Sequence, residues 1–410
     1  MIKSTFTKNI LTLLTGTTIA QAIPILISPI LTRLYSPNDF GVFALFSVIV
    51  TTIATIANGR YELAVMLPKK DEDAINLFAL SLIINFSISL VLFFLVLIFH
   101  NKILALINSN EISFWLYIAP FSIFLLGLYN LLSLFNNRKK YYKDLAKANV
   151  YKSIAMAIVQ LIFGFLKAGS SGLISGQILS YFVSNTKLFF NIKKLNLFSK
   201  IKKIKLIALA KRYKKFPIYN LPNALIDGFR MSLINILIGK FFLLSTLGQF
   251  SLAWRMVQVP SSIIGGAVSQ VFFQKVATSK KSELKYIALN FIKKASLLAM
   301  PMFLIIFFFS KEIFSFIFGK EWEVAGEVAS ILSPWLFLNF LTSPLSTIFI
   351  KLEKQQILLI FGIFYAIIPV FILYFFNSSF LEAIKYISFA MSLMLIFFIF
   401  LLFFILQKVR

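Results

Sequence analysis

Residues 75–99 read INLFALSLIINFSISLVLFFLVLIF and contain no charged side chain. A helix that crosses a lipid bilayer needs about 20 mostly apolar residues, and this stretch exceeds that length. Similar segments recur along the whole chain, which is 59% apolar and 14% charged. Soluble domains have about 45–50% apolar and about 25% charged residues. The sequence therefore predicts an all-α integral membrane protein.

Twelve stretches of the sequence are long and apolar enough to span a membrane. They are Asn9–Leu34, Phe40–Met66, Ile75–Phe99, Phe114–Phe135, Ala148–Leu166, Gly172–Phe190, Phe216–Phe241, Gly248–Val276, Ile287–Phe309, Ala325–Phe349, Ile357–Phe376 and Lys385–Leu406. We therefore expect about 12 transmembrane helices.

Basic residues fall in alternate connections between these stretches. The connections on one side, together with both termini, hold 27 of the 41 Lys and Arg residues, and the opposite connections hold seven. Insertion into membranes keeps short basic loops in the cytoplasm, so we expect both termini to be cytoplasmic. The formal net charge of +26 is thus explained by topology, and it predicts contact with anionic membrane lipids and not with nucleic acid.

The longest polar stretch divides the chain into two sets of six spans. We predict an N-terminal six-helix bundle over residues 1–191, a basic cytoplasmic linker over 192–215 and a C-terminal six-helix bundle over 216–410. Residues 41–45 (GVFAL) and 248–252 (GQFSL) begin corresponding spans, which indicates that the bundles are parallel repeats. Apolar residues at helical spacing in the linker, from Phe198 to Ile207, favour a helix on the membrane surface; a solvated basic loop is the alternative.

Five ionisable residues lie deep within the predicted spans: Arg60, Glu62, Asp227, Arg230 and Arg255. A charge at the bilayer centre costs about 2.5–3.5 kcal/mol on insertion scales, so each must find a partner or water. Residues two apart on one helix do not face each other, so we expect at least one of Arg60 and Glu62 to face water or another helix. Ion pairs within the protein, Asp227 with Arg230 or Glu62 with an arginine of the other half, are the alternative. Three arginines against two acids favour a cationic cavity for an anionic substrate, because arginine binds phosphate in a bidentate manner. We accordingly predict substrate binding by the arginines, and coupling or charge orientation by the acids.

Other cations within spans are expected to reach the membrane surface. Lys152, Lys187, Lys293 and Lys294 lie near the predicted cytoplasmic ends of their spans. Long lysine side chains in such positions extend toward the headgroups. We therefore assign no function to these four residues.

The composition also removes most catalytic chemistry. The chain has no cysteine and a single histidine, His100, which follows an apolar run. Zinc, haem-thiolate and iron–sulfur sites need cysteine or histidine ligands. We expect no catalytic residue, no metal, no cofactor and no enzymatic activity.

Several motifs resemble the bacterial polysaccharide-export (O-antigen) flippases of the multidrug/oligosaccharidyl-lipid/polysaccharide transporter superfamily. They are residues 31–41 (LTRLYSPNDFG), 59–64 (GRYELA), 67–68 (LP), 318–326 (FGKEWEVAG) and 333–335 (SPW). The resemblance implies two helical bundles around a cationic cavity. It also implies that the protein moves an undecaprenyl-diphosphate-linked oligosaccharide, an O-antigen or capsule repeat unit, from the cytoplasmic to the periplasmic leaflet.

On this basis we predict a flippase of the bacterial inner membrane that works by alternating access. A polysaccharide polymerase and a chain-length regulator are its expected protein partners. Two alternatives stay open at this point: a multidrug efflux transporter of the same superfamily, and a membrane enzyme of polysaccharide assembly. Arginines outnumber acids in the spans, which disfavours the export of cationic drugs, and the short outer connections disfavour an enzyme.

Overall fold

The computed structural model describes residues 2–107, 109–196 and 198–408. Within these ranges, the side chains of residues 2–14, 223, 226–227, 229–231, 259–268, 270–271, 274 and 277 lie outside the description. The long helices are α1 (Ile2–Leu34), α2 (Pro37–Ala54), α4 (Asp71–Ile107), α5 (Ser113–Arg138), α6 (Tyr142–Phe165), α7 (Ser170–Lys193), α9 (Leu221–Phe241), α10 (Leu244–Thr278), α11 (Leu284–Phe318), α12 (Glu323–Lys351), α13 (Gln355–Phe375) and α14 (Phe380–Gln407). The short ones are α3 (Tyr61–Ala64), η1 (Phe198–Lys200), α8 (Lys203–Arg212), η2 (Phe216–Asn220), η3 (Lys281–Glu283) and η4 (Lys320–Trp322).

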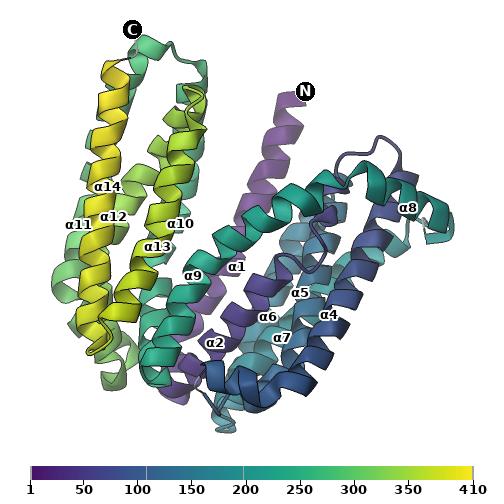
Figure 1. Cartoon of the computed structure of the whole chain (residues 1–410), viewed down its shortest axis with the longest axis horizontal. Helices are drawn as coiled ribbons and strands as arrows, with labels where there is room; N and C mark the ends of the chain where they lie inside the picture. The colour runs from purple at the N-terminus through teal and green to yellow at the C-terminus, as the bar shows by residue number, and fades with distance from the viewer. Residues whose placement is uncertain (1, 108, 197, 409–410) are drawn as a thin grey trace. The chain divides into compact units, whose positions relative to one another are not determined.

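The prediction of an all-α membrane protein with about 12 spans is confirmed (Figure 1). Each predicted span overlaps one long helix in the described part of the chain. Nine segments among the described residues are long and apolar enough to cross a membrane. Large apolar side chains remain exposed on these helices, for example Phe400 and Phe308, as expected for surfaces that face lipid.

The chain forms two compact units, residues Met1–Lys240 and Phe241–Arg410. Helix α9 belongs to the first unit, where the hydroxyls of Thr52 on α2 and Ser232 on α9 share a hydrogen bond. The predicted division of the chain into two repeated six-helix bundles, separated by the linker at residues 192–215, is a statement about an internal repeat. It stays a prediction.

The first unit buries a core of aromatic and aliphatic side chains between α4, α5 and α7. Phe78 and Phe135 meet edge to face with ring centroids 5.6 Å apart, and Leu188 is fully buried beside them. Helices α6 and α7 approach closely because Gly176 faces Gln160: a Cβ at Gly176 would lie 2.6 Å from Gln160 Cγ. Small residues permit close helix packing in membrane proteins.

In the second unit α12 packs against α10, α11 and α14 (Figure 1). Ser310 on α11 donates a hydrogen bond to the carbonyl of Gly326 on α12, 2.7 Å away. The indole of Trp335 on α12 donates to the Tyr365 hydroxyl on α13 at 2.6 Å. Hydrogen bonds between side chains and neighbouring helices thus join α11, α12 and α13.

The turn between α1 and α2 explains the most specific part of the 31–41 motif. Ser36 caps α2, with its Oγ accepting from the Asp39 backbone N–H at 3.2 Å. The Asp39 carboxylate accepts from the Ser36 backbone N–H at 2.9 Å, which completes a capping box. Pro37 occupies the first turn, where its missing N–H is harmless. Tyr35 donates to the Gln160 carbonyl on α6 at 2.6 Å, so this corner is joined to the rest of the unit.

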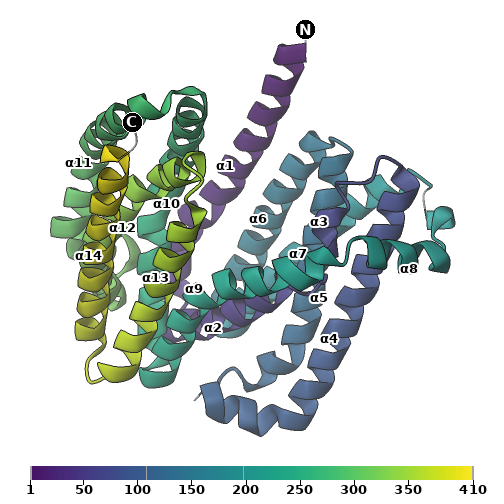
Figure 2. The ribbon, with the colours of Figure 1, turned by 45° about the horizontal axis from the view of Figure 1, so that its top comes forward.

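The basic linker contains helix α8, which docks at the end of the first unit beside α3 and α4 (Figure 2). Tyr61 on α3 donates to the Ala210 carbonyl at 3.0 Å. Asn76 on α4 accepts from the Lys202 backbone N–H at 2.9 Å. Leu209 is buried in the core, whereas Ile204 is exposed. Helix α8 shows that this segment of the linker is helical and not a loop. Its contact with lipid stays a prediction.

Candidate substrate-binding site

The polypeptide leaves the helical path between α2 and α3, within the predicted span Phe40–Met66. Helix α2 ends at Ala54, and Gly59 and Arg60 follow with φ angles of 61° and 60°. A non-glycine residue in this left-handed region is uncommon. Asn58 anchors the break by donating to the Gly127 carbonyl on α5 at 2.8 Å. A continuous helix over this span was therefore a wrong prediction.

The break brings Arg60 and Glu62 together, which corrects the expectation that these two residues cannot pair with each other. Arg60 Nη1 lies 3.6 Å from Glu62 Oε1, and the two side chains are 22% and 5% exposed. The same Nη1 donates to the Thr55 carbonyl at 3.2 Å. The rule that residues two apart diverge holds on a helix, whereas Arg60 has left-handed backbone angles and lies at the position just before the first turn of α3.

Polar atoms with unused hydrogen-bonding capacity surround this ion pair. Arg60 Nε, Glu62 Oε2 and Asn58 Oδ1 are buried and have no hydrogen-bond partner among the described residues. Buried polar atoms are nearly always paired. The segment therefore has the capacity to bind a polar ligand or water.

A second asparagine reaches the same part of α5. Asn85 on α4 donates to the Phe124 carbonyl at 3.0 Å, and its Oδ1 is buried without a described partner. Gly127 provides the room, because a Cβ there would lie 2.7 Å from Asn85 Nδ2. Asn58 and Asn85 were missed by the sequence analysis, although the Asn58–Gly59 pair is a common turn signal.

The other predicted site residues are not brought to this ion pair by any described contact. The side chains of Asp227 and Arg230, on α9, lie outside the described residues. Arg255 is on α10 in the second unit, and its side chain is exposed. The assignment of substrate binding to Arg60, Arg230 and Arg255, and of coupling to Glu62 and Asp227, thus stays a prediction.

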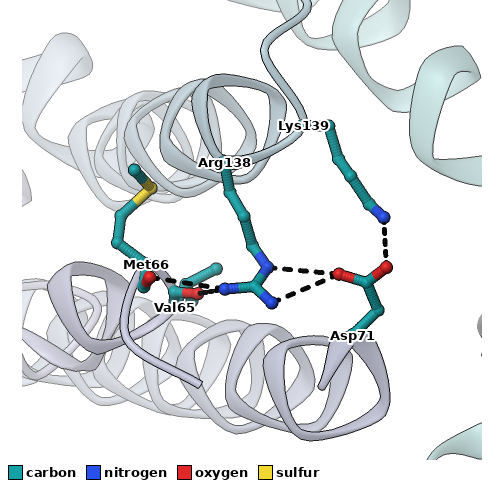
Figure 3. A network of polar contacts seen from close by, with 5 residues as sticks. All are labelled: Val65, Met66, Asp71, Arg138 and Lys139. Atoms are coloured by element: carbon teal, nitrogen blue, oxygen red, sulfur yellow. Dashed lines mark hydrogen bonds and ion pairs between the residues drawn. The ribbon is translucent and has the colours of Figure 1, made fainter. Parts of the chain in front are cut away.

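A charged cluster joins the loop after α3 to the end of α5 (Figure 3). The Arg138 guanidinium donates from Nε and Nη2 to Asp71 Oδ1 at 3.3 and 3.2 Å. Its Nη1 donates to the carbonyls of Val65 and Met66, both at 3.3 Å. Lys139 pairs with the other oxygen of Asp71. This cluster fixes the segment that follows the Arg60–Glu62 pair.

Lys152 was predicted to extend toward the membrane surface, but its side chain turns toward α5 and α7. Its ammonium lies over the rings of Tyr129 on α5 and Tyr181 on α7, at 4.5 and 4.8 Å from their centroids. The reason is the helix start: α6 begins at Tyr142 and not at Ala148. Lys152 is therefore ten residues into its helix. Lys187, by contrast, pairs with Asp144 at 3.1 Å.

Solved structures place this fold among membrane transporters. The chain is similar to an inward-facing multidrug resistance MATE family transporter of the MOP superfamily, with a TM-score of 0.73, 16% identity and coverage of 96% of this chain and 95% of the other. It is also similar to the inward closed conformation of the lipid II flippase MurJ, with a TM-score of 0.71, 16% identity and coverage of 95% and 87%. The class of protein is therefore a multi-pass membrane protein with a transporter fold.

Sequence comparison narrows this class. The family model described as polysaccharide biosynthesis protein matches residues 30–327, and the chain belongs to that family. A curated relative is the probable low-salt glycan biosynthesis flippase Agl15 of Haloferax volcanii, 26% identical over 192 residues. The match covers 46% of this chain and 34% of that protein, so this chain spans about a third of the relative's length. The predicted resemblance to polysaccharide-export flippases is confirmed at the level of the family.

Proposed function

We propose that this protein is a flippase that moves a lipid-linked oligosaccharide between the leaflets of a membrane. Its membership of a polysaccharide biosynthesis family supports the substrate class, and the name of its Haloferax relative supports the flippase activity. The substrate we propose is an undecaprenyl-diphosphate-linked O-antigen or capsule repeat unit. It would move from the cytoplasmic to the periplasmic leaflet of a bacterial inner membrane, with both termini of the protein in the cytoplasm.

The observation that carries this proposal is the surplus of cations in the sequence of the predicted spans. Deep positions of these spans hold three arginines, Arg60, Arg230 and Arg255, and two acids, Glu62 and Asp227. Even if each acid pairs with one arginine, one arginine is left for an anionic ligand. The diphosphate carries about two negative charges, and an inside-negative potential of 100 mV favours their outward movement by about 2.3 kcal/mol each.

Alternating access explains how a bulky sugar passes. A sugar head group is costly to place in hydrocarbon because its hydroxyls lose their hydrogen bonds to water. The lipid tail can stay in the bilayer while the head group passes through a polar path in the protein. Multidrug efflux is the second candidate, since the MATE transporter shares the fold; its cationic substrates would favour acids where this chain carries arginines.

The test is flipping in proteoliposomes that contain a fluorescent undecaprenyl-diphosphate oligosaccharide, with an impermeant quencher added outside. Wild-type protein should make both leaflets accessible, and alanine at Arg60, Arg230 and Arg255 together should abolish this. The matched control removes three exposed lysines, Lys280, Lys281 and Lys285, and should flip normally. Wild-type rates from the triple arginine variant, at equal amounts of reconstituted protein, would exclude the arginines as the substrate site. A wild-type protein that moves cationic drugs and not the lipid would instead support efflux.

A further inference from the structure

Three residues on adjacent helices of the first unit meet at similar depth. Lys152 lies ten residues after the start of α6, which is about 15 Å along the helix axis. Tyr129 lies nine residues before the end of α5, and Tyr181 twelve residues before the end of α7. These positions correspond to about 14 and 18 Å from the same end of the unit. The lysine ammonium therefore lies well inside the helix bundle, between two aromatic rings.

The rings are held in place by their own hydrogen bonds. The Tyr129 hydroxyl donates to Asn149 Oδ1, one turn before Lys152 on α6. Gln177 on α7 donates to the Tyr181 hydroxyl at 2.9 Å, and its Oε1 accepts from the Ser47 hydroxyl on α2, also at 2.9 Å. Tyr181 and Gln177 are buried. Four helices thus position the two ring faces before any ligand arrives.

The lysine has no counter-charge in the described part of the chain. No carboxylate among the described residues lies within ion-pair distance of Lys152, whereas Lys187 on the neighbouring helix pairs with Asp144. Aromatic faces attract a cation through their quadrupole but do not neutralise it. Its N–H donors also have no hydrogen-bond acceptor among the described residues. An ionisable side chain kept at such depth indicates a functional site.

We propose that the Lys152 ammonium, held between Tyr129 and Tyr181, binds a phosphate of the lipid diphosphate during transport. The inference rests on the proposed function, and it names a binding residue that the arginine assignment omitted. Lysine binds phosphate as a compact point charge with three donors. The tyrosine rings hold the ammonium without neutralising it, so its full charge is available to the anion.

Binding to full-length protein tests this proposal directly. The protein is placed in phosphatidylcholine nanodiscs, and its affinity is measured for undecaprenyl diphosphate and, separately, for inorganic pyrophosphate. Lys152→Gln should weaken binding of the lipid at least about tenfold, the lower limit for a lost charge-assisted hydrogen bond. Lys152→Arg should keep most of the affinity. Lys147→Gln is the matched control, because Lys147 is exposed on the same helix and its change removes the same charge.

A second measurement uses the wild-type protein, so it does not depend on variants that fail to fold. Reductive methylation followed by mass spectrometry should show that undecaprenyl diphosphate protects Lys152 and leaves Lys147 unaffected. Equal labelling of Lys152 with and without the lipid would overturn the proposal, as would unchanged affinity of Lys152→Gln. Binding of pyrophosphate but not of the lipid would assign the site to free phosphate and refute the lipid assignment.

Three further outcomes separate this inference from its rivals and from the proposed function. If Asp227→Asn restores lipid binding and flipping to Lys152→Gln, the lysine serves as a counter-ion to that acid, and the proposal is wrong. If wild-type protein neither binds nor flips the lipid, the proposed function fails together with the inference. If wild-type protein does both and Lys152→Gln is unaffected, the inference alone fails.

Discussion

Replacing Arg138 by glutamine should loosen the end of the first unit without unfolding it. The guanidinium donates to one oxygen of Asp71 and to the carbonyls of Val65 and Met66. Glutamine is shorter and uncharged, so it cannot reach all three partners. The two carbonyls lose their donor, and Lys139 alone remains on Asp71.

The expected loss in the free energy of unfolding depends on how exposed the Arg138 and Asp71 side chains are. A hydrogen bond to a charged group contributes about 1.5–3 kcal/mol, and the Arg138 side chain is 11% exposed. Asp71 is 43% exposed, however, and solvent screens ion pairs at the surface to about 0–1 kcal/mol. We therefore expect the free energy of unfolding to fall by about 2 kcal/mol. For a unit of this size that corresponds to a Tm lower by about 4–8 °C.

The assay is thermal unfolding of purified protein in detergent, followed by intrinsic fluorescence. Lys143→Gln is the control, because Lys143 is exposed nearby and should change the Tm by no more than about 2 °C. In the double variant with Asp71→Asn, the loss should be smaller than the sum of the single losses, since the two residues interact directly. A Tm of Arg138→Gln equal to that of the wild type would refute the view that this cluster holds the loop.

Three further predictions follow from the corner, the ion pair and the topology. Ser36→Ala should lower the free energy of unfolding by about 1 kcal/mol through loss of the helix cap, measured by the same thermal assay; an unchanged Tm would contradict a role for the cap. Glu62→Gln should reduce flipping in proteoliposomes, because it removes the partner of Arg60 from a buried position, and wild-type rates would show that the pair is dispensable. Cysteines introduced singly at positions 140, 205 and 280 should react with an impermeant thiol reagent only after the inner membrane is permeabilised, whereas positions 170 and 379 should react in intact cells; labelling at 205 in intact cells would reverse the predicted topology.

Hydropathy was sufficient to predict the helices because a bilayer imposes a simple requirement. Every backbone polar group in the hydrocarbon must be satisfied within its own segment, so apolar length alone indicates a helix. The same reasoning failed between Ala54 and Tyr61. There the backbone turns at Gly59 and Arg60, and the Thr55 carbonyl in this break accepts a hydrogen bond from the Arg60 side chain, which a hydropathy average does not register.

The candidate site was predicted less well than the fold, for a related reason. Lys143 and Lys147 lower the local hydropathy, so the predicted span began at Ala148, six residues after the true start of α6. Lys152 was therefore placed too near the surface. Its aromatic partners come from α5 and α7, and no sequence pattern relates Tyr129 or Tyr181 to a residue on another helix. Contacts between helices depend on rotation and register, which composition does not specify.

The capping box at Ser36 and Asp39 has a consequence for the order in which the first unit can fold. The box and its proline shape the turn that joins α1 to α2, whereas the lysine between two tyrosines belongs to α5, α6 and α7. Both hydrogen bonds of the box join residues only three positions apart, and contacts this local cost little loop-closure entropy. The turn from α1 to α2 can therefore form before the distant helices of the unit have packed, and it gives them a corner on which to assemble.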